Sequence, residues 1–142
     1  MELSKQAHCT YYTRYHLVFV TKYRRNILKQ GMGAYLVKIL PHVTKRYPEV
    51  HIITAKTDED HLHMCVSIPP KFAVSTVVQY MKGWSSHAMR KKFSFLTLPE
   101  SRMGQFWSDG YFVSTVGINE EVIRKYIEHQ GKEDRGQALL VL

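Results

Sequence analysis

Residues 61–68 restrict the fold of this 142-residue chain most strongly, because polar and apolar side chains alternate strictly along them. The apolar set is Leu62, Met64, Val66 and Ile68, and the polar set begins with His61 and His63. This period of two predicts a β-strand with one face in a hydrophobic core. The two imidazoles then share the opposite face, where they could converge on one divalent ion. A His-x-His pair on a strand is more often solvated surface than a metal site, and both interpretations stay open at this point.

The length and composition indicate one domain that binds a polyanion. A chain of 142 residues can bury a single hydrophobic core, so we expect one domain over residues 1–142. Cys9 and Cys65 form no paired motif, and no apolar run is long enough to span a membrane, which predicts a cytoplasmic protein. The net charge of +8 makes nucleic acid the most natural partner. Nine Tyr, six Phe and two Trp could supply stacking surfaces for bases.

Hydrophobic periodicity predicts four strands and three helices. The strands are expected at 11–23, 50–56, 61–68 and 106–116, the last broken or bulged at Asp109-Gly110. The helices are expected at 32–47, 73–92 and from 120 to a stop at Gly131, and Pro41 indicates a kink or a late start in the first. The order β-α-β-β-α-β followed by a helix predicts an α+β, ferredoxin-like fold. Both crossover helices then cover one face of an antiparallel sheet, and the two histidines lie on the open face.

The final helix carries a second candidate group. Tyr126 and Gln130 are four residues apart, so the phenol and the amide share one helix face. Taken alone, Tyr126 would be a core aromatic and Gln130 a surface residue.

Six basic residues are candidates for contacts with phosphates. They are Lys22, Arg24 and Arg25 at the end of the first strand, and Lys82, Arg90 and Lys91 on the second crossover helix. Solvated surface explains the first cluster equally well, and the basic side of a helix is usually plain surface.

Several blocks of the sequence resemble a known family. His61-Leu62-His63 resembles the histidine-hydrophobe-histidine signature of HUH nucleases, and residues 126–130 resemble the Tyr-x-x-x-Gln helix of their single-tyrosine branch. Residues 15–25, residues 80–83, and residues 106–107 with 110–117 resemble further blocks in the right order. On these residues the chain is identified as a member of the IS200/IS605 family of single-tyrosine transposases.

The resemblance implies an activity and a site. It implies Tyr126 as nucleophile, His61, His63 and Gln130 as ligands of Mg²⁺ or Mn²⁺, and a 5′-phosphotyrosine intermediate with a free 3′-OH. The implied substrate is single-stranded DNA with subterminal hairpins. The implied assembly is a prokaryotic homodimer in which the tyrosine helix of one chain can complete the histidine site of the other. The missing Gly-x-x-x-x-Gly-Lys-Ser/Thr motif agrees with a reaction that needs no ATP.

Two other functions compete with this interpretation. A domesticated transposase of the type associated with palindromic repeats (REP) would share the fold and the site. An RNA-binding module of the RRM type would share the element order, and Gly110-Tyr111-Phe112-Val113 resembles part of its stacking motif. Asp109 stands where that motif has Lys or Arg, and the module gives no role to two histidines on the open face.

Overall fold

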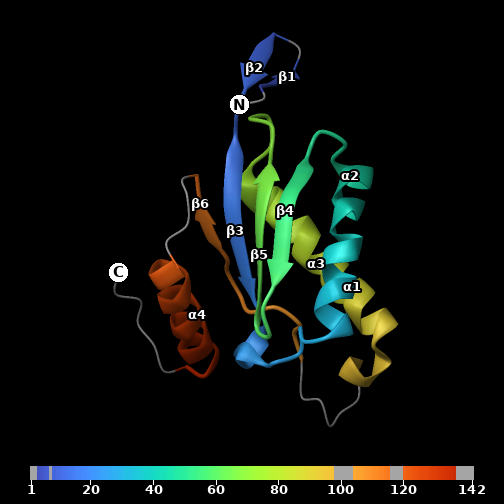
Figure 1. Cartoon of the computed structure of the whole chain (residues 1–142), viewed down its shortest axis with the longest axis vertical. Helices are drawn as coiled ribbons and strands as arrows, with labels where there is room; N and C mark the ends of the chain where they lie inside the picture. Colours follow the sequence, from blue (N-terminus) through green and yellow to red (C-terminus); the bar gives the residue numbers. More distant parts are fainter. Residues whose placement is uncertain (1–2, 7, 98–103, 116–119, 137–142) are drawn as a thin grey trace.

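A four-stranded antiparallel sheet forms the centre of the molecule (Figure 1). The structure is a computed structural model that describes residues 3–6, 8–97, 104–115 and 120–136. The strands are β3 (Arg14–Val20), β4 (His51–Thr57), β5 (His61–Ser67) and β6 (Phe112–Ser114), in the order β4-β5-β3-β6. Helix α1 (Gly31–Ile39) connects β3 to β4, and α3 (Val74–Lys92) connects β5 to β6. This is the ferredoxin-like arrangement that the sequence predicted.

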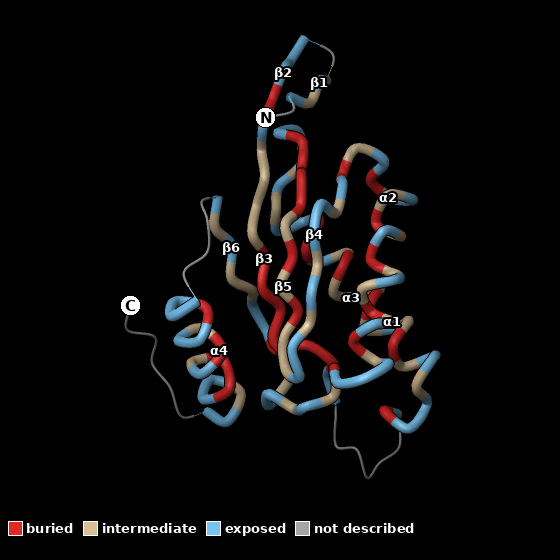
Figure 2. The backbone as a smooth tube through the Cα atoms, viewed as in Figure 1, coloured by how far each residue is buried: buried red, intermediate tan, exposed pale blue. Residues whose placement is uncertain are grey.

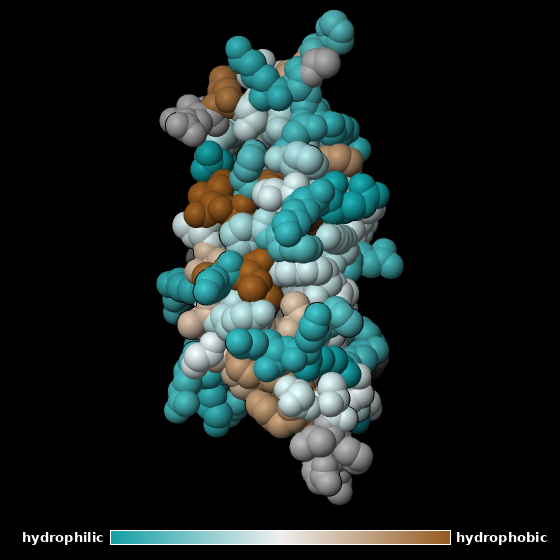
Figure 3. Space-filling model, turned by 90° about the vertical axis from the view of Figure 1, so that its right-hand side faces the viewer, coloured by the Kyte–Doolittle hydropathy of each residue, from teal (hydrophilic) through white to brown (hydrophobic). Residues whose placement is uncertain are grey.

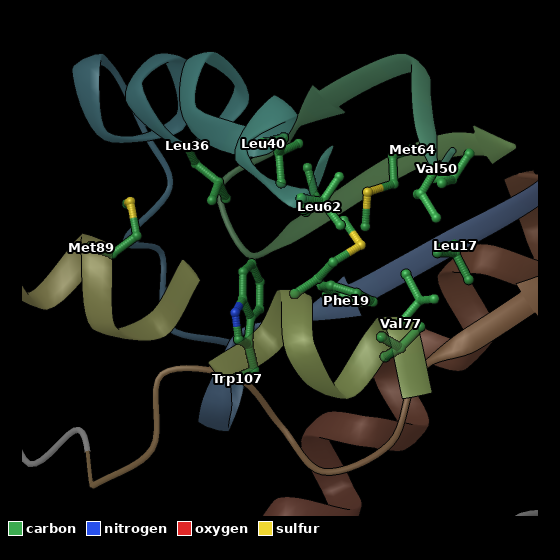
Figure 4. Packing of buried hydrophobic residues seen from close by; sticks show 14 of the residues in the cluster. Leu17, Phe19, Leu36, Leu40, Val50, Leu62, Met64, Val77, Met89 and Trp107 are labelled. Carbon is green, nitrogen blue, oxygen red and sulfur yellow. The ribbon is translucent and has the colours of Figure 1, made fainter. Parts of the chain in front are cut away.

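The hydrophobic core lies between the sheet and the crossover helices (Figure 4). Leu17 and Phe19 of β3 and Leu62 and Met64 of β5 are fully buried there. They pack against helix residues that include Leu36, Leu40, Val77 and Met89. The apolar half of the alternating β5 sequence therefore faces the core, as predicted, and the histidine half faces the other way.

The first crossover segment bends at Pro41, as the sequence indicated. Helix α1 ends at Ile39, a 3₁₀ turn η2 spans Leu40–His42, and α2 continues over Val43–Arg46. A proline inside a helix lacks the backbone N–H that the ladder needs, which explains the interruption.

The strand predicted at residues 11–23 is wrong at both ends. A separate hairpin of β1 (Ser4–Gln6) and β2 (Cys9–Tyr11) precedes β3 and lies at one end of the molecule (Figure 1). After β3 the chain forms a 3₁₀ turn, η1 (Lys22–Arg24). Tyr23 and Arg24 adopt φ values of 59° and 52°, a left-handed conformation that ends the strand.

The last strand is also shorter than predicted, although its break at Asp109-Gly110 is confirmed. Only Phe112–Ser114 pairs with β3, and earlier residues contact the sheet through one bridge between Thr21 and Trp107. Gly110 has a φ of 83°, which favours glycine. The carbonyls of Ser108 and Gly110 accept hydrogen bonds from the ammonium group of Lys82, at 2.6 and 2.7 Å, instead of continuing the ladder.

Helix α4 (Glu120–Asp134) packs on the sheet face that we predicted to be open. Its Ile123 and Ile127 contact Val18 and Val20 of β3, whose side chains alternate with the core residues. Figure 2 shows the buried residues of α4 along the side that faces β3. The open face is therefore restricted to the part of the sheet beside this helix.

The predicted stop of α4 at Gly131 is wrong. Gly131 is buried against the side chain of Arg24. A Cβ at this position would overlap that side chain, whose Cγ lies 2.9 Å from the Cβ position. The helix continues to Asp134, and Gly136, at a φ of 69°, follows its end. Glycine is therefore needed at 131 for close packing and not for ending the helix.

The outer surface is mainly polar on the side that Figure 3 shows, where apolar residues form small separate patches. No helix in the described ranges is long and apolar enough to cross a membrane. A short 3₁₀ turn, η3 (Ser94–Thr97), follows α3.

Candidate active site

His61 and His63 line one pocket of about 380 Å³ between β5, the β4–β5 turn and α4. The other lining residues are Arg24, Lys56, Thr57, Asp58, Asp60, Glu120, Ile123, Arg124 and Ile127. The strand pairing places His61 opposite Val20 and His63 opposite Val18, on the α4 side of the sheet. Both imidazoles therefore lie on the face that the alternating sequence predicts, within one cavity.

The carboxylate of Asp60 fixes the orientation of the His61 ring. Its Oδ1 atom lies 3.0 Å from Nδ1 of His61. Hydrogen bonds from His61 and Arg24 hold the pKa of Asp60 below its usual range, against the opposing effect of burial. An ionised carboxylate only accepts, so Nδ1 carries the proton and Nε2 keeps its lone pair for a ligand in the pocket.

The surroundings of His63 favour the neutral imidazole. Burial lowers the pKa of His63, and electrostatic interactions with His16, His61 and Lys56 lower it further. The carboxylate of Glu120 acts in the opposite direction. The ring of His16 lies 6.0 Å from that of His63, centroid to centroid. A neutral imidazole is the form that binds metal ions.

The imidazoles of His61 and His63 would supply only two of the ligands that a metal ion needs. Two imidazoles with free nitrogens suit Mn²⁺, and Mg²⁺ takes mainly oxygen ligands. The described residues contain no group of three or more His, Cys, Asp or Glu side chains that could hold an ion. The remaining ligands would therefore come from oxygen atoms outside this set.

Tyr126 and Gln130 lie together on the flank of α4 that faces β6, away from the histidine pocket. The phenol oxygen of Tyr126 and Oε1 of Gln130 are each 3.8 Å from the position that a Cβ on Gly110 would occupy. The Tyr126 ring packs against Phe112 of β6 at 5.8 Å. The shared helix face predicted for the pair is thus present, but Gln130 is buried and not on the surface.

The two candidate groups are separate within one chain. β3 lies between β5, which carries the histidines, and β6, which Tyr126 contacts. Ile123 and Ile127 pack over the β3 residues Val18 and Val20. Among the described residues, the lining of the histidine pocket includes neither Tyr126 nor Gln130.

The phenol of Tyr126 is held in its neutral form. Burial raises the pKa of Tyr126, and the negative charge of Asp134 raises it further. Its hydroxyl is buried and has no hydrogen-bond partner among the described atoms. A phenol in this environment is a poor nucleophile, so attack requires a change of surroundings or an activating group.

The last turn of α4 is fixed to η1 by Asp134, which lies beyond the helix end predicted at Gly131 and so in the expected C-terminal tail. Its carboxylate is buried and lies 3.3 Å from the ammonium group of Lys22. It also accepts hydrogen bonds from the backbone amide of Tyr23, at 2.8 Å, and from the hydroxyl of Ser108. Nothing in the local sequence distinguishes this aspartate from a surface residue.

Most of the basic residues predicted to contact DNA have intramolecular partners. Lys22 pairs with Asp134, Arg24 with Asp60, Lys82 with the two carbonyls described above, and Arg90 donates to the Gly104 carbonyl at 2.7 Å. The guanidinium of Arg25 lies 5.7 Å from the Tyr23 ring, and Lys91 is exposed. Contacts with DNA stay a prediction for all six, and Lys91 is the best placed to make them.

Comparison with known proteins agrees with this architecture. The family described as "Transposase IS200 like" matches residues 9–130. The transposase of insertion sequence element IS200 from Salmonella typhimurium is 38% identical over 133 residues, covering 91% of this chain and 84% of that protein. The crystal structure of a candidate transposase from Deinococcus radiodurans superposes with a TM-score of 0.80 at 27% identity, over 89% of this chain and 97% of that one. A REP-associated tyrosine transposase bound to a REP hairpin shares the fold, with a TM-score of 0.51 at 12% identity over 97% of this chain and 76% of that one.

Proposed function

The chain belongs to the IS200-like transposase family, and from this premise we propose that it cleaves and rejoins single-stranded DNA by metal-assisted attack of a tyrosine. The observation that carries the proposal is the pair of imidazoles in one pocket, beside the helix that bears Tyr126. A phosphodiester repels nucleophiles because it is negatively charged. Its cleavage therefore needs both a positioned nucleophile and a positive charge near the phosphate.

His61 and His63 are the residues that would hold the ion, with Gln130 as the third ligand implied by the family resemblance. A bound Mg²⁺ or Mn²⁺ would neutralise charge on the non-bridging oxygens of the scissile phosphate. The hydrogen bond between His61 and Asp60 supports this assignment, since metal-binding imidazoles generally donate their second N–H to a carboxylate or carbonyl. Lys56 adds a further positive charge at the pocket.

Tyr126 is the proposed nucleophile. Its phenolic oxygen loses its proton and bonds to phosphorus, and the bond from phosphorus to the 3′ oxygen of the neighbouring nucleotide breaks. That oxygen takes up a proton and becomes a free 3′-OH, while the other strand end stays attached as a 5′-phosphotyrosine. A different 3′-OH then reverses the step and joins the strands. One phosphodiester replaces another, so no ATP is required.

The separation of Tyr126 from the histidines supports a homodimer with shared sites. Within one chain the phenol lies against β6, and the imidazoles lie beyond β3. We propose that α4 of a second copy brings its phenol and the amide of its Gln130 to the histidine pocket. We therefore assign the complete site to two chains, one supplying the histidines and the other the tyrosine helix.

The proposed substrate is single-stranded DNA that carries subterminal hairpins, in the cytoplasm of a prokaryote. The net charge of +8 supports a nucleic acid as the partner. The REP-associated relative, which is bound to a REP hairpin, shares the fold. Hairpins from insertion-element ends and hairpins from genomic palindromic repeats, tested side by side, would distinguish a transposase from its REP-associated counterpart.

A denaturing gel tests the covalent step. The protein is mixed with a labelled hairpin oligonucleotide and Mn²⁺, and a band that migrates more slowly under denaturing conditions is expected for wild type. Tyr126→Phe should abolish this band, while His61→Ala should abolish cleavage and leave hairpin binding largely intact. A covalent band that persists in Tyr126→Phe would refute the nucleophile, and metal-independent binding without any adduct would favour the RRM alternative.

A mixing experiment tests the shared site. His61→Ala and Tyr126→Phe should each be inactive, so the two variants are unfolded and refolded together to allow exchange of subunits. A shared site predicts activity in the mixture, because one of the two sites in a heterodimer combines intact histidines with an intact tyrosine. A site built within one chain predicts that the mixture stays as inactive as each variant alone, since every chain lacks either the histidine or the tyrosine.

A further inference from the structure

Asp60 uses both of its carboxylate oxygens for contacts with different parts of the candidate site. Oδ1 lies 3.0 Å from Nδ1 of His61, and Oδ2 lies 3.1 Å from Nε of Arg24. The backbone carbonyl of Asp60 is also fixed, because it accepts hydrogen bonds from the amide and the hydroxyl of Thr21 at 3.0 and 3.1 Å. The carboxylate therefore bridges a candidate metal ligand and the η1 turn.

Arg24 connects this bridge to the tyrosine helix. Its aliphatic stem fills the space that Gly131 leaves on α4, where any Cβ would collide with it. Its φ of 52° places its backbone in the left-handed region, within the η1 turn. His61 thus contacts Asp60, Asp60 contacts Arg24, and Arg24 contacts Gly131. We call these four residues the contact series.

We propose that Asp60 is a positioning residue that couples the orientation of the His61 ring to the docking of α4, with Arg24 as the connecting group. The inference rests on the proposed function, because it takes His61 as a metal ligand and α4 as the helix that carries the nucleophile. When α4 is docked, Arg24 is fixed against Gly131 and aims Nε at Asp60. The carboxylate then holds the Nδ1 proton of His61, and Nε2 faces the pocket.

The alternative is a surface ion pair without wider effect. Arg24 is 39% exposed at its side chain, and exposed ion pairs of this kind contribute little to stability. In that case a change at Gly131 would leave His61 as it is. The two interpretations therefore differ in whether a substitution at Gly131 alone changes the orientation of the His61 ring.

Two variants interrupt the contact series without replacing a histidine, and because Arg24 also lines the histidine pocket, Gly131→Ala is the one that leaves the side chains of the pocket unchanged. Gly131→Ala displaces the stem of Arg24, and Arg24→Met keeps an unbranched stem but removes the donor to Asp60. Asp60→Asn removes the carboxylate itself. Gly83→Ala is the matched control, because Gly83 also lies within a helix and a Cβ there would meet nothing within 4 Å.

Mn²⁺ affinity of the DNA-free protein is measured by calorimetry, together with the imidazole ¹⁵N spectrum of His61 without metal. Asp60→Asn should weaken Mn²⁺ binding about 10–100-fold, the range expected for loss of a partner that orients a ligand. Gly131→Ala and Arg24→Met should weaken it several-fold and shift the His61 signals, and Gly83→Ala should do neither. In the Asp60→Asn background, Gly131→Ala should have no further effect, because its influence passes through Asp60.

The outcomes separate this inference from the proposed function. If Asp60→Asn weakens binding but Gly131→Ala and Arg24→Met match wild type in affinity and in the His61 spectrum, the coupling to α4 is wrong. If wild type and His61→Ala bind Mn²⁺ equally, the proposed metal site fails, and the His61 spectra of the same variants still decide whether the coupling exists. Arg24→Met covers the case in which Gly131→Ala does not fold.

Discussion

The carboxylate of Asp134 accepts a 2.8 Å hydrogen bond from the backbone amide of Tyr23, which ties the last turn of α4 to the turn that follows β3. The same carboxylate is paired with Lys22, whose side chain is only 16% exposed. These contacts join the tyrosine helix to the sheet at the end remote from Glu120. Together with the packing of Ile123 and Ile127, they explain why α4 lies on its own sheet in the single chain.

Replacement of Asp134 should therefore loosen α4. Asp134→Ala removes an ion pair and leaves a largely buried ammonium group on Lys22 without its partner. We expect the free energy of unfolding to fall by about 2–4 kcal/mol, in the range measured for lost charged partners in partly buried sites. Urea denaturation followed by circular dichroism measures the change. Glu128→Ala, an exposed position on the same helix, should stay within about 0.5 kcal/mol of wild type.

Removal of the Tyr126 hydroxyl should leave stability unchanged or raise it. The hydroxyl is buried without a partner among the described atoms, so the folded state gains nothing from it. We expect Tyr126→Phe to change the free energy of unfolding by between about 0 and +1 kcal/mol. Equilibrium unfolding of the two proteins in parallel measures the difference, with Tyr12→Phe as an exposed control. A loss of more than about 1 kcal/mol would mean that the hydroxyl has a stabilising partner in solution.

The sequence predicts those parts of the fold that depend on local periodicity. Alternation along residues 61–68 gives both the strand and its buried face, and Pro41 marks the bend of the first crossover segment. The helix bearing Tyr126 and Gln130 is likewise visible as an apolar stripe. In each case the physical cause is a repeat of side chains within one element, so no knowledge of distant residues is required.

The features that the sequence does not give depend on residues far apart in the chain. Ile123 and Ile127 indicate that one side of α4 is buried, but not that Val18 and Val20 cover it. Asp134 looks like a solvated residue of the tail until Tyr23 and Lys22 are placed beside it. A basic side chain likewise has the same local sequence whether it is exposed or bound to a carbonyl of another element.

Lys82 and Lys91 lie on one helix and illustrate this last point. Their substitutions should have different effects on stability and on DNA binding. The ammonium group of Lys82 holds the Ser108 and Gly110 carbonyls, whereas Lys91 is exposed. Lys82→Met should lower the free energy of unfolding by about 1–3 kcal/mol. Lys91→Met should leave stability unchanged and, if Lys91 contacts a phosphate, reduce the salt dependence of DNA binding by about one unit of slope.

Both variants are measured in the same two assays, urea unfolding and fluorescence anisotropy with a hairpin oligonucleotide over a series of salt concentrations. Equal stability of Lys82→Met and wild type would show that the contacts with the two carbonyls contribute nothing. A salt slope unchanged in Lys91→Met would remove this residue from the candidate DNA surface.

The ionisation of Tyr126 should be displaced to high pH in the free protein. Burial and the charge of Asp134 raise its pKa, while an unfolded tyrosine ionises at about pH 10. The folded state thus retains the phenolic proton more strongly than the unfolded state. The stability that this difference contributes is fully present below about pH 10 and is lost as the pH rises through the higher folded pKa. At neutral pH the phenol is neutral, so deprotonation must occur in a different environment from the one that α4 provides here.

Absorbance of the phenolate at 295 nm, followed during alkaline titration, tests this displacement. Around pH 10, wild type and Tyr126→Phe should give the same amplitude, because Tyr126 has not yet ionised. Burial is the larger cause of the raised pKa of Tyr126, and Asp134→Asn removes only the added effect of the charge, so part of the missing amplitude should move to lower pH. If Tyr126→Phe instead loses one tyrosine's absorbance near pH 10, the phenol is open to solvent in the free protein, and the docked position of α4 is not the one that prevails in solution.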